Sequence, residues 1–498
     1  MWLTRHLIAR IISFLLSQTT FIEQHSIWLT QKSSLYNKNL TLNYKMQQEK
    51  IIIVGAGLCG TLLAVRMAQR GYLVHLYERR GDMRLESVDA GRSINLALSS
   101  RGLAALEKVG LKEEILKSCI PMTGRLIHPL GADPFLSRYS GREEDYINSV
   151  SRWGLNVALL DMAEKEENIR LFFNHKCVKV DLEQASATFN NALTTGEIVD
   201  TGSVVIGTDG AGSAVRKSMM GKTTQLLFNY SQDFLRHGYK ELTIQPGKNG
   251  AYKIEKNALH IWPRGNFMII ALPNLNGSFT VTMFHPYEGE LGFNNLTSKA
   301  KVTAFFEQYY PTLIPYIPNY VEEFFENPVG TLGTIKCYPW QAFGKTLVMG
   351  DAAHAIVPFY GQGMNASFED VRVFDEVMDE FDGDWEKTFY QFQELRYRNT
   401  NAIADLAIDN FIEMQDKVDD EDFKKKRKLE MQLEQQHKDY YSKYSLVTFR
   451  PDMPYVKAME LGRAQDELLL KIVGERGTEE LNLDEVYRRV MALSKLDY

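Results

Sequence analysis

Residues 51–78 read IIIVGAGLCGTLLAVRMAQRGYLVHLYE, and this stretch decides the fold class of the chain. Its four leading β-branched residues predict a strand buried on both faces, and a GxGxxG turn, residues 55–60, follows at once. A helical pattern then runs to Arg70, and a second predicted strand, residues 72–77, ends in Glu78. Strand, glycine turn, helix and acid in this register form a dinucleotide-binding fingerprint. The pattern favours dinucleotide binding over a turn with a purely structural role. Its glycines let the backbone approach a pyrophosphate, and its acid accepts a ribose hydroxyl.

Residues 348–371, VMGDAAHAIVPFYGQGMNASFEDV, carry a second glycine signal. A short apolar strand ends in Gly350 and Asp351, and a Gly-Gln-Gly step, residues 361–363, leads into a helix predicted to begin near Met364. A helix entered through glycines presents unpaired N–H groups and a positive dipole end, which suit a partly anionic ligand. Taken alone, the stretch is equally consistent with a strand–loop–helix connection that binds nothing.

Three further patterns organise the rest of the chain. A predicted strand at 204–206 leads to Thr208-Asp209-Gly210, which again places an acid and a glycine where α/β folds bind ligands. Alternating apolar runs between residues 226 and 330 predict an antiparallel sheet that forms an inserted substrate-side domain. From Glu369 onward the pattern is mostly helical, and the basic run 424–428 is predicted to be a solvated helix face.

Composition excludes some classes of function. The 498 residues include 44% hydrophobic and 24% charged residues, with a net charge of −6, as in ordinary globular proteins of two or more domains. This balance disfavours nucleic-acid binding, which needs a basic face. The four cysteines are far apart and form no CxxC pair, which disfavours a disulfide framework or a structural zinc site.

Residues 1–46 differ in kind from the rest of the chain. They carry five Lys or Arg against one acid, and their apolar patch at residues 11–16 is too short to span a bilayer. Such a segment is compatible with a targeting presequence. The simpler prediction is that translation begins at Met46, just ahead of the first strand, and that residues 1–46 are an extension outside the fold.

Together the three glycine and acid motifs resemble the flavin aromatic hydroxylases, the p-hydroxybenzoate hydroxylase-like superfamily. Longer strings are similar to its kynurenine-hydroxylating branch, and the resemblance extends from about residue 48 to about residue 450. These strings are GRSINLALSSRG (91–102), IPMTGRLIH (120–128), SVSR (149–152), GDAAHAIVPFYGQGMNASFED (350–370) and DNFIEM (409–414).

The resemblance implies an FAD-dependent monooxygenase that hydroxylates L-kynurenine at C3, in tryptophan degradation and pyridine nucleotide biosynthesis. NADPH would reduce FAD, O2 would add to it, and a hydroperoxide at flavin C4a would be the reagent, so no protein group is nominated as a catalytic base. His354 is expected to be structural. No second GxGxxG unit follows a strand, so a separate NADPH-binding domain is not expected.

The resemblance also assigns site residues. Its substrate contacts fall on Arg125, Tyr139, Asn410 and Tyr444, where the arginine fork suits the carboxylate of an amino acid and the other three can hydrogen-bond it. Taken alone, Arg125 would more commonly be a surface arginine. The implied FAD contacts are Gly55, Gly57, Cys59, Gly60, Tyr77, Glu78, Arg79, Arg80, Ala97, Arg152, Cys177, Asp351, Met364 and Asn365. Tyr360 and Cys177 depart from the resembled pattern, which has Phe and an aliphatic residue there.

The predicted fold class is α/β, with a Rossmann-like FAD-binding domain, an interleaved antiparallel-sheet substrate domain and a C-terminal helical region. The predicted FAD-binding domain comprises 47–120, 146–225 and 330–385, the substrate domain comprises 121–145 and 226–329, and the helical region is 386–498. The C-terminal hydrophobic anchor of the mitochondrial relatives is missing, so a soluble, cytoplasmic, bacterial-type enzyme is expected.

Two alternatives stay open from the sequence. A hydroxylase or epoxidase of the same fold acting on another aromatic or isoprenoid substrate would not need the carboxylate-binding set. A flavin-binding regulatory protein would show no kynurenine-dependent oxidation of NADPH. A flavin halogenase is disfavoured because the sequence has no Trp-x-Trp-x-Ile-Pro segment.

Overall fold

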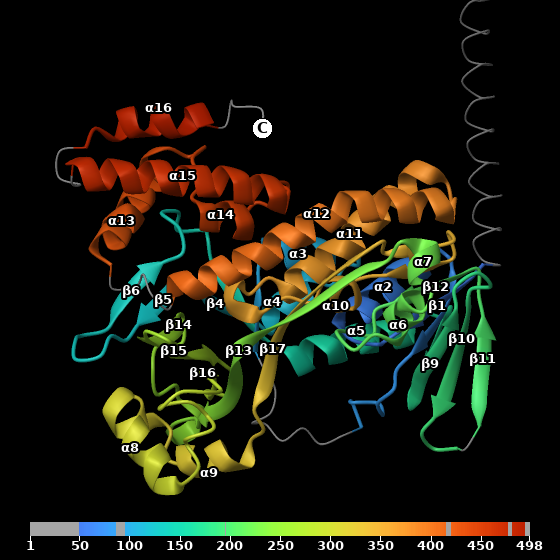
Figure 1. Ribbon diagram of the computed structural model, residues 1–498, viewed down its shortest axis with the longest axis horizontal. Helices are drawn as coiled ribbons and strands as arrows, with labels where there is room; N and C mark the ends of the chain where they lie inside the picture. The colour runs from blue at the N-terminus through green and yellow to red at the C-terminus, as the bar shows by residue number, and fades with distance from the viewer. Residues whose placement is uncertain (1–48, 86–94, 195, 415–419, 477–480, 494–498) are drawn as a thin grey trace, which may run out of the picture.

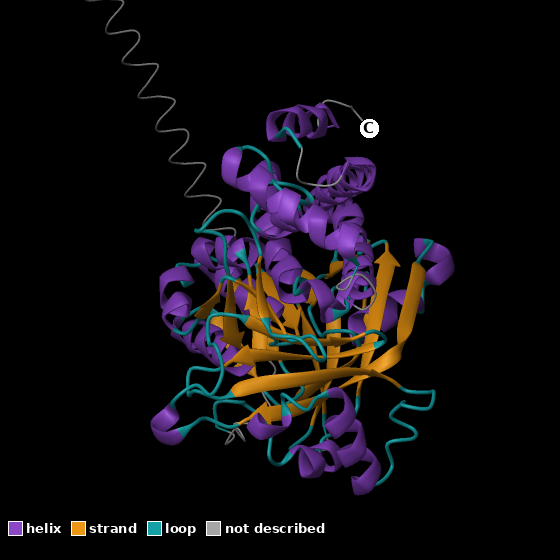
Figure 2. Cartoon of the chain, turned by 90° about the vertical axis from the view of Figure 1, so that its left-hand side faces the viewer, coloured by secondary structure: helices purple, strands orange, loops and turns teal. Residues whose placement is uncertain are grey.

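The computed structural model describes residues 49–85, 95–194, 196–414, 420–476 and 481–493 (Figure 1). The predicted extension, residues 1–46, lies outside these ranges. Strands occupy the middle of the molecule, with helices above and below them (Figure 2). Among the described residues, no helix combines the length and the apolar character needed to cross a membrane.

A six-stranded sheet with the order β18-β19-β12-β1-β2-β8 carries the glycine turn. Strand β1 pairs in parallel with both β2 and β12, and residues 51–53 are fully buried, as the β-branched run predicts. The strands are β1 (Lys50–Val54), β2 (Leu73–Tyr77), β8 (Ile169–Phe172), β12 (Val204–Gly207), β18 (Gln341–Ala342) and β19 (Thr346–Val348).

Helices pack around this sheet and bring distant parts of the chain together. Helix α11 packs against α2, α3 and α12, so the second glycine stretch lies beside the first. Helix α11 begins at Gly363, one residue before the predicted start. The helices of this layer are α2 (Leu58–Gln69), α3 (Ser100–Lys108), α4 (Lys112–Lys117), α5 (Arg152–Lys165), α6 (Ala214–Met220), α7 (Thr223–Leu226), α10 (Asp351–His354), α11 (Gly363–Phe381) and α12 (Trp385–Ile412).

A seven-stranded sheet forms the second large layer, with the order β17-β13-β16-β15-β14-β5-β6. Its strands are antiparallel except for the parallel pair β14 and β5. They are β5 (Gly124–Ile127), β6 (Phe135–Arg138), β13 (Asn229–Ile244), β14 (Leu259–Arg264), β15 (Phe267–Pro273), β16 (Phe279–Pro286) and β17 (Gly330–Tyr338). Helices α8 (Lys299–Tyr309) and α9 (Tyr320–Glu326) share a hydrophobic cluster with this sheet, and the alternating pattern gave no sign of either helix.

Two three-stranded sheets complete the strands. One comprises β3 (Asn95–Leu98), β7 (Ile147–Ser151) and β4 (Ile120–Met122), and the other β9 (His175–Asp181), β10 (Ser186–Asn191) and β11 (Glu197–Thr201). The string 91–102, which contributes to the resemblance, falls partly outside the described residues, which resume at Asn95. Short 3-10 helices are η1 (Lys248–Gly250), η2 (Ile314–Tyr316) and η3 (Pro358–Tyr360).

The C-terminal helices lie above the rest of the molecule in Figure 1. They are α13 (Glu421–Gln436), α14 (Lys443–Thr448), α15 (Tyr455–Arg476) and α16 (Leu483–Leu493). The prediction that 424–428 forms a solvated face is wrong at Lys426, which is buried and whose Nζ lies 2.6 Å from the Asp466 carboxylate. Helix α15 packs on α13 and supplies this acid, so the lysine is neutralised inside the helical region.

Candidate active site

The glycine turn after β1 is shaped to receive a pyrophosphate. Gly55 has a φ of +106°, and a Cβ at Gly60 would lie 2.0 Å from the carbonyl oxygen of Gly55, so both positions require glycine. A Cβ at Gly57, by contrast, would meet nothing among the described residues within 4 Å. Helix α2 begins directly after Gly57 without a side-chain cap or an acid in its first turn. Its free N–H groups therefore face an open approach that suits a phosphate.

The acid at the end of β2 holds this turn together. Glu78 is buried, and its Oε2 accepts a hydrogen bond of 3.1 Å from the Ala56 backbone N–H. Its Oε1 accepts from the backbone N–H of Arg80 at 3.0 Å and from the Arg80 Nε at 2.7 Å. The neighbouring Arg79 is exposed. The predicted ribose-binding acid thus lies at the turn, with two arginines at its outer side.

Two of the predicted cofactor residues contribute mainly to packing. The ring of Tyr77 lies between those of Phe172 and Phe189, at 4.5 and 3.7 Å, and its hydroxyl donates to Asp200 at 2.9 Å. Cys177 is buried on β9, and burial raises the pKa of its thiol to about 12. Both side chains belong to the hydrophobic core that includes the six-stranded sheet.

Asp209, the acid of the Thr-Asp-Gly motif, lies beside the glycine turn, although it was not among the predicted FAD contacts. Its Oδ2 accepts from the backbone N–H of Ala214 at 2.6 Å, and its Oδ1 is buried without a hydrogen-bond partner among the described residues. A Cβ at Gly55 would lie 2.7 Å from the Asp209 Cα, so the two segments are in close contact. Burial raises the pKa of the Asp209 carboxyl. The Thr-Asp-Gly motif was the available signal.

The start of α11 is fixed by one buried amide. Asn365 is fully buried, and its Oδ1 accepts from the Ser99 backbone N–H at 2.9 Å. Its Nδ2 donates to the carbonyl oxygens of Ala97 and Gly361, both at 2.8 Å. The side chain of Asn365 therefore joins β3 and the start of α3 to the first turn of α11, where Met364 is partly buried.

The remaining predicted cofactor residues surround the two glycine stretches. The thiol of Cys59 contacts the Ser367 carbonyl oxygen at 3.5 Å, and a Cβ at Gly350 would lie 3.0 Å from its Sγ. These contacts bring the first turn of α2 against α11 and against the residue before α10. Asp351 is exposed as the first residue of α10, and Arg152 is exposed as the first residue of α5.

His354 is buried in an ion-pair network. Its Nε2 lies 2.5 Å from Asp370 Oδ2, and Asp370 also accepts from the Arg396 Nε at 2.7 Å and from the Gly350 backbone N–H at 3.0 Å. Burial alone would raise the pKa of Asp370, but His354 and Arg396 hold it below its ordinary value. The His354 ring also stacks on Trp340, with 5.1 Å between the ring centroids. This histidine holds the turn before α11 in place.

Four predicted or adjacent polar side chains meet near η3. Tyr444 of α14 stacks between Tyr139, at 5.2 Å between ring centroids, and Tyr360 of η3, at 5.5 Å. We call Tyr139, Tyr444 and Tyr360 the tyrosine ladder. The guanidinium carbon of Arg125, on β5, lies 5.0 Å from the Tyr444 ring centroid and 5.7 Å from that of Tyr139. Residues more than 300 positions apart are thus brought to one place.

Several polar atoms of this group are buried and unsatisfied. Arg125 Nε, Tyr139 Oη and Tyr360 Oη find no hydrogen-bond partner of acceptable geometry among the described residues. Burial raises the pKa of Tyr139 and Tyr444, while the nearby Arg125 acts to lower both. A cation and neutral phenols in an enclosed place can bind a carboxylate by charge-assisted hydrogen bonds.

Asn410 of α12 anchors the loop that carries the third phenol. It is buried, and its Nδ2 donates to the Phe359 carbonyl oxygen at 2.6 Å. Phe359 also stacks on Phe411, with 4.1 Å between ring centroids. The structure therefore brings Asn410 to η3, beside the tyrosine ladder, through the residue next to Tyr360.

Charged side chains of the C-terminal helices fix the positions of Tyr139 and Tyr444. Arg427 Nη2 donates to the Tyr139 carbonyl oxygen at 2.7 Å. Lys443, next to Tyr444, pairs with Glu413 at 2.5 Å and with Asp466 at 2.6 Å. The sequence gave no sign of these contacts, because each joins residues of different segments of the chain.

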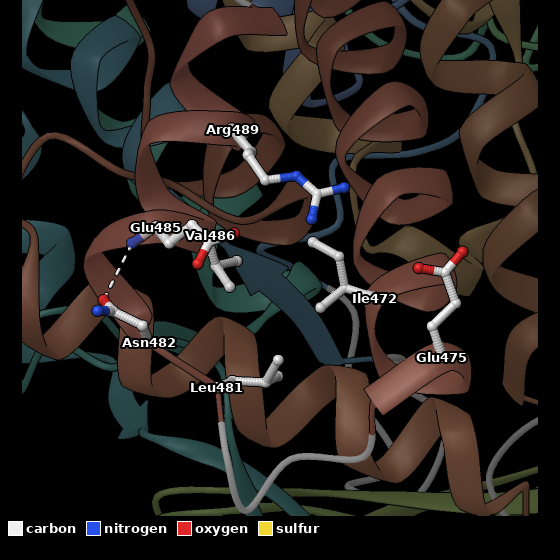
Figure 3. Close-up of a pocket in the computed structure, with 7 residues that line it drawn as sticks. All are labelled: Ile472, Glu475, Leu481, Asn482, Glu485, Val486 and Arg489. Carbon is white, nitrogen blue, oxygen red and sulfur yellow. Dashed lines mark hydrogen bonds between the residues drawn. The ribbon is translucent and has the colours of Figure 1, made fainter.

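A separate cavity of about 60 Å³ lies between α15 and α16 (Figure 3). None of the predicted site residues contributes to it. It is lined by Ile472, Glu475, Leu481, Asn482, Glu485, Val486 and Arg489. The cavity therefore lies apart from the glycine turn and the tyrosine ladder.

Comparison with known proteins adds the chemical context. A family model for the FAD binding domain matches residues 48–230 and 331–375. The chain is 44% identical to a kynurenine 3-monooxygenase of Myxococcus xanthus over 86% of this chain and 91% of that protein. It is 43% identical to a kynurenine 3-monooxygenase of Dictyostelium discoideum over 88% of this chain and 95% of that protein.

Solved structures share the fold at low sequence identity. The tetrameric form of 2-methyl-3-hydroxypyridine-5-carboxylic acid oxygenase matches with a TM-score of 0.60 and 18% identity, over 74% of this chain and 93% of that one. PqsL of Pseudomonas aeruginosa in complex with 2-aminobenzoylacetate matches with a TM-score of 0.57 and 16% identity, over 74% of this chain and 97% of that one. These neighbours support the α/β fold with its FAD-binding domain.

Proposed function

The chain belongs to the kynurenine 3-monooxygenase family, and from this premise we propose that it converts L-kynurenine to 3-hydroxy-L-kynurenine. The reaction takes NADPH, a proton and O2 and gives NADP+ and water beside the hydroxylated product. The single observation that carries the substrate assignment is Arg125 beside the tyrosine ladder, partly buried and with its Nε enclosed and unpaired among the described residues. The carboxylate of an amino acid would supply an anionic partner, and the structure gives Arg125 no ion pair among the described residues.

The residues at the two glycine stretches fit FAD. The open approach at Gly57 and the uncapped start of α2 suit its pyrophosphate, and Glu78 suits its ribose. The positive end of the α11 dipole suits the electron-rich edge of the flavin. Asn365 fixes the position of this helix end by its hydrogen bonds to Ser99 and Ala97. When bound, FAD would supply the redox chemistry: the electrons of NADPH reduce one oxygen atom of O2 to water, and the other oxygen atom is inserted into a C–H bond of the aromatic ring.

The side chains of this chain contribute binding and orientation. We assign the carboxylate of kynurenine to the fork of Arg125, with hydrogen bonds from Tyr139 and Tyr444 and with η3 held in place by Asn410. The aromatic amine of kynurenine already activates the position ortho to it, so the substrate needs no ionisation by a strong base. The interior position of the ladder keeps bulk water from the reacting ring.

The two large sheets support separate roles for two domains, one that binds FAD and one that binds the substrate. We propose that the six-stranded sheet with α2, α5 and α11 binds FAD, as the boundaries 47–120, 146–225 and 330–385 imply. The seven-stranded sheet, which includes β5 with Arg125, then forms the substrate side; six of its strands lie within the predicted 121–145 and 226–329, while β17 lies in the predicted FAD-binding segment 330–385. The C-terminal helices from residue 386 onward close the site by bringing Asn410 and Tyr444.

One assay tests the proposed function directly. Purified protein loaded with FAD should oxidise NADPH faster when L-kynurenine is added, and 3-hydroxy-L-kynurenine should appear. Acceleration by a different aromatic compound, with none by kynurenine, would place the chain on another substrate. No acceleration by any aromatic compound, together with bound FAD, would leave a flavin-binding protein without this turnover.

The arginine assignment is tested by Arg125→Ala. Because the lost interaction is a charge-assisted hydrogen bond, kynurenine binding should weaken by about 1.5–3 kcal/mol or more, with FAD retained. Arg138→Ala is the matched control, since Arg138 is an exposed arginine on the neighbouring strand β6. Equal dissociation constants for kynurenine in Arg125→Ala and the unmodified protein would remove Arg125 from the site.

A further inference from the structure

The third phenol of the tyrosine ladder has no assigned role. Tyr360 is 5% exposed, and its hydroxyl oxygen is buried without a hydrogen-bond partner among the described residues. Its ring is nearly parallel to that of Tyr444, at 14°, just as the ring of Tyr444 is to that of Tyr139, at 10°. Tyr360 thus extends the proposed substrate-binding group toward the start of α11.

A buried hydroxyl without a partner is costly to a folded protein. Removing it from water without a replacement hydrogen bond disfavours the fold, and phenylalanine at the same position would avoid this cost. Two other tyrosines are satisfied, since Tyr455 donates to Gln362 at 2.9 Å and Tyr338 donates to Glu394 at 2.8 Å, whereas the hydroxyls of Tyr310 and Tyr440 lack a partner among the described residues. Tyr360 instead lies in the same group as Arg125 Nε and Tyr139 Oη, which are also unsatisfied.

We propose that Tyr360 is a specificity-determining residue whose hydroxyl hydrogen-bonds a polar group of the bound amino acid substrate. This inference rests on the proposed function, since it assigns a further contact in the same site. The geometry behind it is the ladder, which places three phenols in one stack and leaves the outer two hydroxyls unsatisfied. A satisfied hydroxyl gives affinity, and a ligand without the matching polar group leaves it unpaired.

The hydroxyl acts as a neutral group. Burial raises the pKa of Tyr360 well above its ordinary value, and the neighbouring Tyr444 and Glu413 act in the same direction. A neutral phenol can both donate and accept a hydrogen bond, so it can pair with a carboxylate, a ketone or an amine. It does not abstract a proton at neutral pH, so its contribution is to binding and orientation.

The test compares Tyr360→Phe with Tyr310→Phe. Tyr310 is also fully buried with an unsatisfied hydroxyl, but it packs in the cluster of α8 and α9, away from the ladder. In Tyr360→Phe the dissociation constant for L-kynurenine, measured by titration of the flavin absorbance, should rise about 3- to 10-fold. In Tyr310→Phe it should stay at the value of the unmodified protein.

Thermal unfolding supplies a readout that a merely structural hydroxyl would move in the opposite direction. Without kynurenine, both variants should unfold at a temperature no lower than that of the unmodified protein, because each loses an unsatisfied buried hydroxyl. The upward shift in unfolding temperature caused by kynurenine should be smaller in Tyr360→Phe only. A lower unfolding temperature without kynurenine, with unchanged kynurenine affinity, would show that the hydroxyl serves the fold and would overturn the inference.

The unmodified protein separates this inference from the proposed function. If it does not bind L-kynurenine, the proposed function fails first and the inference falls with it. If it binds and Tyr360→Phe binds equally well, only the inference fails. If Tyr360→Phe binds L-kynurenine more weakly, an analogue without the ring amine locates the contact. If Tyr360→Phe also binds this analogue more weakly than the unmodified protein does, the hydroxyl contacts the amino acid end or the ketone. If the two proteins bind the analogue equally well, the hydroxyl contacts the ring amine.

Discussion

At positions 57 and 60 the same amino acid serves two different purposes. Gly60 is required by packing, because a side chain there would overlap the Gly55 carbonyl oxygen and the Thr208 hydroxyl. Gly57 has ordinary extended φ and ψ angles and an open surrounding, so the fold itself does not require glycine. We propose that glycine at residue 57 serves the close approach of the cofactor to the backbone.

The two glycines therefore predict different outcomes for the same substitution. Gly57→Ala should fold with an unchanged circular dichroism spectrum but retain little FAD after purification, since the new methyl group occupies the approach of the pyrophosphate. Gly60→Ala should lower the unfolding temperature or the yield of soluble protein, because the methyl group meets backbone. Full FAD occupancy in Gly57→Ala, measured from the ratio of flavin to protein absorbance, would contradict this role of Gly57.

At the residue scale, the local backbone structure could be predicted from the sequence. The glycine turn, Glu78 and the start of α11 lie within short stretches whose spacing dictates their geometry. The tyrosine ladder joins α14, η3 and the residue that follows β6, and no local pattern predicts that Tyr139, Tyr444 and Tyr360 stack. Tyr139, Tyr444 and the neighbouring Arg125 were nominated only through resemblance, and the contact of Tyr360 with them came from the structure.

Strand β16 shows how one element carries a titratable group into an apolar place. His285 is fully buried, and its ring lies within about 5 Å of the rings of Phe267, Phe293 and Phe305. Its Nε2 donates to the Leu291 carbonyl oxygen at 2.5 Å, and its Nδ1 is buried without a partner among the described residues. Protonation would place a charge on that Nδ1, so burial lowers the pKa of His285 to about 4.

This lowered pKa predicts a loss of stability in acid. In the unfolded chain the histidine takes up its proton near pH 6.5, whereas the folded protein resists until about pH 4. The contribution is complete above pH 6.5 and is lost as the pH falls to 4, by up to about 3 kcal/mol. His285→Phe keeps an aromatic ring but does not titrate, so its unfolding free energy, from urea titrations at several pH values, should fall less between pH 7 and 4.

At the scale of elements, periodicity predicted types better than partners. The alternation at 226–330 predicted the antiparallel strands, but α8 and α9 escaped because each is a short helix with few inward residues. The basic run on α13 was expected to be solvated. This expectation was wrong at Lys426, because Asp466, an acid that pairs with it, comes from α15, 40 residues further on. Patterns along one segment do not report what a second segment brings to it.

At the scale of the whole molecule, Arg101 joins the cofactor side to the C-terminal helices. It is 1% exposed, on α3, and its Nη1 lies 2.6 Å from the Glu369 carboxylate of α11. Its Nε donates to the Val447 carbonyl oxygen at 2.7 Å and its Nη2 to that of Met453 at 2.6 Å. The first of these carbonyls belongs to α14, the helix that carries Tyr444 one turn earlier.

This connection predicts that Arg101→Lys affects substrate more than cofactor. A lysine can keep the pair with Glu369, but it has no planar fork for the two carbonyl oxygens, so α14 loses its fixed position. We expect the unfolding free energy to fall by about 2 kcal/mol or more, and the KM for L-kynurenine to rise several-fold with FAD occupancy unchanged. Arg66→Lys is the matched control, because Arg66 pairs with Asp375 of α11 at 2.6 Å without touching α14. A KM equal to that of the unmodified protein, despite lower stability, would show that Arg101 serves the fold alone; a parallel loss of FAD would show that it serves α11 instead.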